Sequence, residues 1–366
     1  MPCHKRIVTE WKNSWHAKSH FENDEYFKKS VEYVSRKSRK SLNATKVQCA
    51  KCHNPRIMVT KTDVDYEIAA VMGLDKDSEV NKAVNSDAIS EGINCVVCHN
   101  IDKIHYDYPK NKRGIDRVEW TPSGTMTGPY KDAKSPYHKI VSHEFMNEKV
   151  NELCFVCHAN DSSVHGLVFT DMEAEYKRSK SKEKCVTCHM GKKYKGVAST
   201  FRNYHGKERV RSVRSHSFKG AHKEEMLKNA LSLTLKKKKS ALYITLKNSL
   251  PHNVPTGFGA RELLVNISFM DANGKLLATK KISLTRYYTR RHNKASTPHM
   301  AKKQTKDTSI PAKSKKVLKV PLIQEATNVR VEVFYRLVND EVRSLLKLKD
   351  KLWEKKFLIT SKEMKL

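Results

Sequence analysis

Four copies of one short pattern constrain this sequence more than any other feature. Each copy reads Cys-x-x-Cys-His, and the copies begin at Cys49, Cys95, Cys154 and Cys185. They contain eight of the nine cysteines in the chain, and no cysteine follows Cys188. The chemistry of the paired thiols is therefore confined to the first part of the chain.

The pattern is the attachment signature of c-type haem. Two thiols three positions apart can add to the two vinyl groups of one porphyrin, and the adjacent His then meets the iron as its proximal ligand. Zinc ribbons also use Cys-x-x-Cys pairs, but zinc does not require a His directly after each pair. Since His fills 17 of 366 positions, chance would place it after all four pairs with odds of about five in a million. The predicted haem attachment residues are Cys49, Cys52, Cys95, Cys98, Cys154, Cys157, Cys185 and Cys188, with His53, His99, His158 and His189 as proximal ligands.

The first residues, Met1-Pro2-Cys3-His4, match the last four positions of a fifth motif. A cysteine directly before Met1 would complete it, and the same late start would explain why no secretory leader is seen. The alternative is a stray Cys-His pair. We expect a fifth haem here, attached through Cys3 and ligated by His4, and a true start upstream of Met1. As written, Cys3 can supply one thioether bond.

The composition is consistent with a core that is partly porphyrin. Hydrophobic residues make up 38% of the chain, which is low for a conventional globular core. The formal charge is +32, from 71 basic and 39 acidic residues. Such a charge fits nucleic-acid binding, acidic protein partners or a lysine-rich proteome; covalent haem argues against nucleic acid. The propionates of five haems would remove about ten positive charges. No run approaches the 18 apolar residues of a membrane span.

The chain predicts two domains and an α+β fold. Residues 1–227 are polar and predict a mostly helical or irregular multihaem domain, with short helices at 23–35, 75–84 and 142–153. Residues 228–366 alternate apolar and polar side chains and predict an antiparallel β-sandwich. The expected strands are 231–235, 241–247, 262–270, 275–280, 282–288, 317–323 and 329–338, with a turn at 271–274. We expect a long mobile loop at 292–314 and either a strand or a helix after Glu341.

Twelve of the 17 histidines do not follow an attachment cysteine, so distal ligands are in ample supply. A Met ligand would raise the haem potential, but no Met is singled out. The density of predicted haem favours the histidines of the first 225 residues. These are His16, His20, His105, His138, His143, His165, His205, His216 and His222.

Five further stretches carry a resemblance to a known family. They are residues 3–17 with Trp11, Ser14 and the pair His16-Ala17; 128–138, ending in His138; 185–190, a Cys-x-x-Cys-His-Met ending; 215–222; and 248–257 with Arg261. Together they resemble bacterial multihaem cytochromes related to the tetrahaem partner of hydroxylamine oxidoreductase. Pro251 stands where those cytochromes usually have Gly before the His that corresponds to His252.

The resemblance implies closely stacked haems with mainly bis-His ligation, an immunoglobulin-like C-terminal sandwich and a periplasmic location. It supports His16, His138, His216 and His252 as distal ligands, while His20, His105 and His222 remain further candidates. His252 also has a purely structural reading, because a Pro-flanked turn at a strand end suits any polar residue.

Two functions stay open from the sequence. One is an electron carrier of a respiratory chain, with saturated irons, acidic redox partners docked by its lysines and a membrane quinol-linked donor. The other is a multihaem reductase, an oxidoreductase in which one iron keeps an open position for a small nitrogen or sulfur oxyanion. No phosphate loop, nucleophile elbow or His-Glu-x-x-His motif is present, and no catalytic residue is predicted.

Overall fold

The structure is a computed structural model that describes residues 2–107, 109, 112–202, 208–228 and 230–366. Two compact units make up the chain, and each is described by itself. Unit 1 comprises Met1–Ala159 and Glu183–Lys219, and unit 2 comprises Asn160–Lys182 and Gly220–Leu366. The segment Asn160–Lys182, which the sequence places in the first domain, is thus grouped with unit 2, while the domain boundary after residue 227 stays a prediction. His205 lies outside the described residues.

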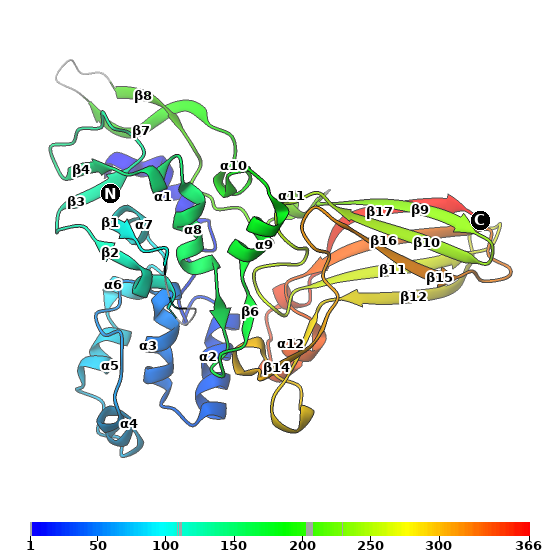
Figure 1. Cartoon of the computed structure of the whole chain (residues 1–366), viewed down its shortest axis with the longest axis horizontal. Helices are drawn as coiled ribbons and strands as arrows, with labels where there is room; N and C mark the ends of the chain where they lie inside the picture. The colour runs from blue at the N-terminus through cyan, green and yellow to red at the C-terminus, as the bar shows by residue number, and fades with distance from the viewer. Residues whose placement is uncertain (1, 108, 110–111, 203–207, 229) are drawn as a thin grey trace. The chain divides into compact units, whose positions relative to one another are not determined.

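Unit 1 is built from short helices and two-stranded pairings (Figure 1). Its helices are η1 (Pro2–His4), α1 (Lys5–Lys12), α2 (Glu25–Ser38), α3 (Leu42–His53), α4 (Val64–Val71), α5 (Glu79–Val84), α6 (Asp87–Ser90), α7 (Cys95–His99), η2 (Gly114–Arg117), η3 (Glu144–Met146), α8 (Val150–His158) and α10 (Cys185–His189). Its strands are β1 (Ile101–Ile104), β2 (Val118–Trp120), β3 (Thr125–Gly128), β4 (Lys139–Ser142), β7 (Tyr194–Arg202) and β8 (Glu208–Val213).

Side-chain caps set where several of these helices begin. Asp24 accepts a hydrogen bond from the backbone N–H of Phe27 at the start of α2, and Ser41 accepts one from Ala44 at the start of α3. Such caps satisfy backbone donors that have no partner within the helix. The predicted helix at 23–35 is confirmed as α2. The helices α2, α3 and α5 share a core made of Phe21, Phe27, Val31, Val47, Ala50, Ile57, Val80, Ala83, Val84 and Ile89.

Two predicted helices of unit 1 are confirmed only in part. The helix expected at 75–84 begins at Glu79, because Ser78 caps it there. The segment 142–153 starts in β4, passes through η3 and becomes helical only from Val150. The parallel pairing of β3 with β4 was not expected at all. Strands this short leave little periodicity in a sequence.

Unit 2 contains two larger antiparallel sheets, with strand orders β15-β10-β9 and β12-β11-β16-β17 (Figure 1). Its strands are β5 (Asp161–Ser162), β6 (Val168–Thr170), β9 (Leu231–Lys238), β10 (Ala241–Asn248), β11 (Glu262–Met270), β12 (Leu276–Leu284), β13 (Arg286–Thr289), β14 (Lys303–Asp307), β15 (Lys315–Pro321), β16 (Asn328–Arg336) and β17 (Phe357–Lys365). Its helices are α9 (Met172–Ser179), α11 (Glu224–Leu227), η4 (Arg291–Asn293), η5 (Pro298–Met300), α12 (Asp340–Leu346) and η6 (Lys351–Trp353).

Alternation of apolar and polar residues explains the strands of these sheets. In β9, Leu231, Leu233 and Leu235 are buried while the residues between them are exposed. A strand with this period presents one face to a core. The turn expected at 271–274 is confirmed, since the Asp271 carboxylate accepts the N–H groups of Asn273 and Lys275. Five of the predicted strands are confirmed within three residues of their bounds. The strands predicted at 275–280 and 282–288 are divided differently, because β12 continues to Leu284 and β13 begins only at Arg286.

Two details of unit 2 correct the expectations from the sequence. The segment 292–314 is not a structureless loop, because it contains η5 and the strand β14, which pairs with β13. The tail after Glu341 is both helix and strand, since α12 is followed by β17. β17 lies beside β9 of the other sheet. The overall fold is therefore α+β, and the immunoglobulin-like sandwich stays a prediction. None of the helices in the described ranges could cross a membrane.

Candidate functional site

Every Cys-x-x-Cys-His motif lies at the end of a helix. The helices α3, α7, α8 and α10 all end at the motif histidine, and η1 ends at His4. On a helix, residues three apart lie on one face, so the two thiols of each motif point to the same side. This is the arrangement that one planar macrocycle needs if it is to bond to both thiols.

Four of the five motif histidines share a second feature, a polar oxygen beside the ring nitrogen Nδ1. In three of them Nδ1 lies against a backbone carbonyl: His4 with Ala198 O at 2.8 Å, His99 with Thr127 O at 2.7 Å, and His189 with Lys219 O at 2.5 Å. In the fourth, Nδ1 of His53 lies 3.0 Å from the hydroxyl of Ser19.

A carbonyl oxygen accepts a hydrogen bond and cannot donate one. Nδ1 of His4, His99 and His189 must therefore carry the proton, which leaves the lone pair of the neutral ring on Nε2. Histidines that bind metals are commonly fixed in this way, because the second hydrogen bond sets the tautomer and orients the ring. The three rings are thus prepared to bind a metal through Nε2.

Two motif histidines face a histidine from elsewhere in unit 1. The rings of His158 and His16 have centres 6.2 Å apart, and those of His99 and His216 have centres 6.3 Å apart with an angle of 26° between their planes. His16 and His216 are two of the four residues predicted as distal ligands. In both pairs the distal residue is more than 100 positions away from the motif histidine in the sequence.

The separation matches that expected for two histidines on one metal. Metal–nitrogen bonds of about 2 Å place the two ligating nitrogens about 4 Å apart, and each ring centre lies about 1.1 Å behind its nitrogen, giving about 6 Å between centres. Direct stacking of two rings would bring them closer, as in the 4.1 Å between Phe27 and His53. The His pairs therefore fit a haem iron between them.

Burial keeps the paired histidines neutral. Burial, together with the neighbouring His158, His189 and His53, lowers the pKa of His16 to about 3. Burial, together with His99, lowers the pKa of His216 to about 4. Only the neutral imidazole has a lone pair for a metal. At neutral pH these rings are therefore in the form that ligation requires.

Phe218 is a residue of this site that the sequence did not single out. Its ring centre lies 4.5 Å from that of His16 and 5.9 Å from that of His216, so it contacts a member of both pairs. Its backbone has a φ of +42°, which is uncommon for a residue with a side chain. The position of Phe218 two residues after His216 was the available signal.

The other predicted distal ligands fall into two groups. Nδ1 of His138 is buried and has no hydrogen-bond partner among the described residues, so this ring lacks the contact that orients His4, His99 and His189. Nδ1 of His20 instead accepts the N–H of Glu22, which in a neutral ring puts the proton on Nε2. Nε2 of His105 lies 2.6 Å from the carboxylate of Glu119. Their ligand roles, and that of His222 in unit 2, remain predictions.

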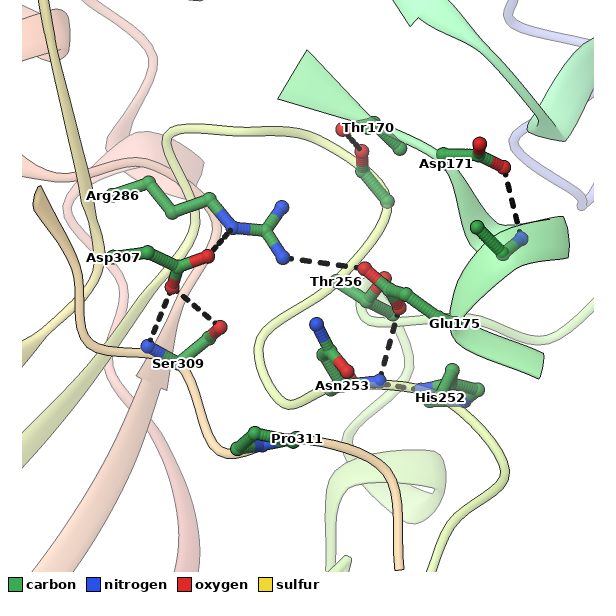
Figure 2. Close-up of polar contacts among 12 residues, drawn as sticks. Thr170, Asp171, Glu175, His252, Asn253, Thr256, Arg286, Asp307, Ser309 and Pro311 are labelled. Atoms are coloured by element: carbon green, nitrogen blue, oxygen red, sulfur yellow. Dashed lines mark hydrogen bonds and ion pairs between the residues drawn. The ribbon is translucent and has the colours of Figure 1, made fainter. Parts of the chain in front are cut away.

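His252 lies in a loop of unit 2 that is held by a buried polar network (Figure 2). The N–H of the next residue, Asn253, donates to the carboxylate of Glu175 on α9 at 3.0 Å, and Thr256 donates to the same oxygen at 2.5 Å. The other oxygen of Glu175 accepts from Arg286 at 3.2 Å. Nδ1 of His252 lies 2.9 Å from the carbonyl of Asn253, so the lone pair of its neutral ring is on Nε2.

The cysteines of the motifs are present as thiols. No disulfide links cysteines in the described part of the chain. Burial raises the pKa of Cys98 to about 11, and it also raises the pKa of Cys95. Within the described ranges, three or more His, Cys, Asp or Glu side chains do not gather into a site for a bare metal ion. Thiols and histidines in these positions fit haem c.

The architecture is that of a solved multihaem cytochrome. The chain is similar over 100% of its length, and over 97% of the other chain, to the crystal structure of a penta-heme cytochrome c552 from Thermochromatium tepidum, with a TM-score of 0.72 and 20% sequence identity. A further solved structure, a structural genomics target, covers 37% of this chain at a TM-score of 0.19, which is too low to indicate a shared fold. No protein-family model and no curated protein matches the sequence.

Proposed function

We propose that this chain is a multihaem c-type cytochrome that carries electrons. The observation that carries the proposal is two pairs of facing histidines. The ring centres of His16 and His158 lie 6.2 Å apart, and those of His99 and His216 lie 6.3 Å apart. In each pair one ring belongs to an attachment motif and the other to a predicted distal ligand. The fold similarity to a penta-heme cytochrome supports the same conclusion.

The residues of unit 1 would hold the haems and tune them. The thiols of each motif form thioether bonds, and the motif histidine binds the iron from one side. His16 and His216 bind two of the irons from the other side. When bound, haem supplies a one-electron couple whose potential depends on its axial ligands and surroundings. The carbonyls of Thr127, Lys219 and Ala198 orient the proximal rings and increase their basicity.

A fifth haem at Cys3 and His4 is part of the proposal. Nδ1 of His4 bonds to the carbonyl of Ala198 as His99 and His189 bond to theirs. The same hydrogen bond sets the tautomer of many histidines that bind metals. The penta-heme cytochrome with the similar fold binds, by its name, five haems. Cys3 would contribute one thioether bond to this haem.

Close stacking of the haems is supported by the crowding of their histidines. His16 is electrostatically coupled to His158, His189 and His53, which belong to three different motifs. Phe218 contacts both His16 and His216. Irons bound at these positions would be near enough to one another to exchange electrons along unit 1.

The location and partners are proposals on the same basis. Covalent haem is installed outside the cytoplasm, so we place the protein in the periplasm, as a carrier between a quinol-linked donor and a terminal reductase. Its 71 basic residues against 39 acidic ones would steer acidic redox proteins to its surface. The two sheets of unit 2 would form a sandwich that serves as a docking module.

Optical and haem analysis of the purified protein tests this function. A pyridine haemochrome assay should give five haems per chain, and the spectra should be low-spin and unchanged by carbon monoxide. A carbon monoxide shift would reveal an open iron and favour a reductase instead. A colourless protein whose mass equals that of the bare polypeptide would refute haem binding altogether.

A further inference from the structure

The helix α4 is an apolar helix that lies on the surface. None of its eight residues is buried. Its sequence, Val-Asp-Tyr-Glu-Ile-Ala-Ala-Val, is one of the most apolar in unit 1, yet Val64 is 72% exposed, Ile68 54% and Val71 84%. An amphipathic helix normally turns such side chains toward a core.

These side chains form a single stripe that continues beyond the helix. Positions 64, 68, 71 and 72 follow the spacing of one helix face. Met72 is 67% exposed, and Leu74, just after the helix, is 69% exposed. Together the five side chains expose on the order of 500 Å² of largely apolar surface, which suits a transient redox encounter better than a permanent complex. This stripe of Val64, Ile68, Val71, Met72 and Leu74 is called the α4 patch below.

Acidic residues surround the α4 patch. Residues 63–79 contain one basic side chain, Lys76, against six acidic ones: Asp63, Asp65, Glu67, Asp75, Asp77 and Glu79. Asp65 and Asp77 are exposed. The segment is therefore strongly negative within a chain whose formal charge is +32. Like an interface, it has an apolar centre and a charged rim. The rim is mainly acidic, although it includes Lys76 and its Glu79 is paired with Lys82.

The patch is tied to a helix that bears an attachment motif. The carboxylate of Glu67 accepts the N–H of Ser41 at 2.8 Å, at the start of α3. Tyr66 packs against the core of α2, α3 and α5, as does Cys49. A protein that docks on the α4 patch would thus lie near the first residues of α3, whose last residues include Cys49, Cys52 and His53.

The acidic rim decides which occupant fits. A second copy meeting patch to patch would bring the two acidic rims together, which like charges oppose. An anionic membrane surface would repel the same carboxylates. A protein whose docking face is an apolar patch ringed by lysines or arginines satisfies both the centre and the rim.

We infer that the α4 patch is the docking site for a basic redox protein, whereas the many lysines elsewhere in the chain would attract acidic partners. The docking itself follows from exposure and charge. Only the delivery of electrons to the haem at Cys49 and Cys52 rests on the proposed function. A carrier with one acidic and one basic docking surface can distinguish its donor from its acceptor by charge.

The test measures the affinity of the holoprotein for mitochondrial cytochrome c at low ionic strength. Cytochrome c is a small protein whose haem edge is surrounded by lysines. Two variants remove different features: V64S/I68S/V71S removes the apolar centre, and D65N/D77N removes rim charge without changing shape. We expect each to weaken binding about tenfold. Two controls change exposed residues elsewhere: V210S, at a position on β8 that is 62% exposed, and E325Q, which changes an exposed acid of unit 2. Both should bind within about twofold of the wild-type affinity.

Five outcomes would overturn the inference. Two concern binding of cytochrome c: the wild-type protein does not bind it, or the wild type and both patch variants bind it equally. Two concern V64S/I68S/V71S: this variant loses haem, or it abolishes a dimer that the wild type forms. The fifth is binding to phosphatidylglycerol vesicles that depends on the patch. Loss of haem would mean that the patch packs on porphyrin. Binding is measured separately from electron transfer, so a docking failure is distinguishable from a failure of the proposed function. Soret circular dichroism verifies that each variant is folded.

Discussion

His16 and His216 illustrate what makes a histidine a ligand at the scale of single residues. Both are half-buried and neutral at pH 7, and both face a motif histidine across a gap that fits one metal. Nδ1 of His216 also lies 3.2 Å from the carbonyl of Arg214, which leaves its lone pair on Nε2. Burial, tautomer and facing partner together distinguish these rings from the surplus histidines of the chain.

Replacing His216 with Met should change one haem and leave the others as they are. A Met ligand stabilises ferrous iron relative to His, so one potential is expected to rise by on the order of 100 mV. Spectroelectrochemical titration of wild type and H216M measures this shift. H165M is the control, since His165 is exposed and lies in unit 2. Unchanged potentials in H216M would show that His216 is not a ligand.

The sequence predicted the ligating side chains better than the groups that support them. The motif histidines follow from the repeated pattern, and His16 and His216 were found through a family resemblance. The oxygens that orient the rings, such as those of Thr127 and Lys219, belong to the backbone. Every residue has a backbone carbonyl, so the sequence does not show which carbonyl will accept the hydrogen bond of a histidine. Only folding brings Ala198 to His4, which is 194 positions away.

At the scale of elements, α9 illustrates how a short helix is fixed within unit 2. Glu175 is 3% exposed and Arg286, on β13, is 5% exposed, so their ion pair at 3.2 Å lies in the interior (Figure 2). Burial opposes the charge of Arg286, but Asp307, Tyr288 and Glu175 outweigh it and raise its pKa. Charges buried in this way stabilise only while every partner is present.

The substitution Glu175→Gln should destabilise unit 2 strongly. It leaves Arg286 with less compensation in a buried site and weakens the hold on Asn253 and Thr256, at a cost of about 3 kcal/mol. Glu173→Gln on the same helix is the matched control, because its ion pair with Lys177 is at the surface and should contribute less than about 1 kcal/mol. Chemical denaturation followed by circular dichroism compares the two. Equal stabilities would show that the network is not needed.

The strands of unit 2 were predictable because they alternate, and the exceptions had no such pattern. Strand β14 reads Lys-Gln-Thr-Lys-Asp, which is polar throughout, and it exists because β13 pairs with it. The pairing is a tertiary contact and leaves no period in the sequence. Helix α9 was likewise missed, since its eight residues include charges on several faces.

At the scale of the whole molecule, the two units differ in what fills their interiors. Unit 2 buries Leu242, Ile244, Leu246, Leu263 and Ile267 completely, each at 0% exposure. Unit 1 has separate clusters, namely the ten-residue core of α2, α3 and α5 and a second one of Ile101, Ile104, Phe145 and Val156. Burial of apolar side chains is the main favourable term in folding. We therefore expect unit 1 to need haem to complete its interior and unit 2 to fold without it.

A variant with all nine cysteines changed to serine should consequently fold only in part. Without thioether bonds the haems are not retained, and unit 1 loses the interior that would offset its chain entropy, as small metal-dependent domains do without their metal. Unit 2 contains none of the nine cysteines and keeps its apolar core. Two-dimensional NMR should then show dispersed amide signals from unit 2 and collapsed signals from unit 1. Dispersed signals from both units would mean that side chains alone suffice to fold the haem-binding part of the chain.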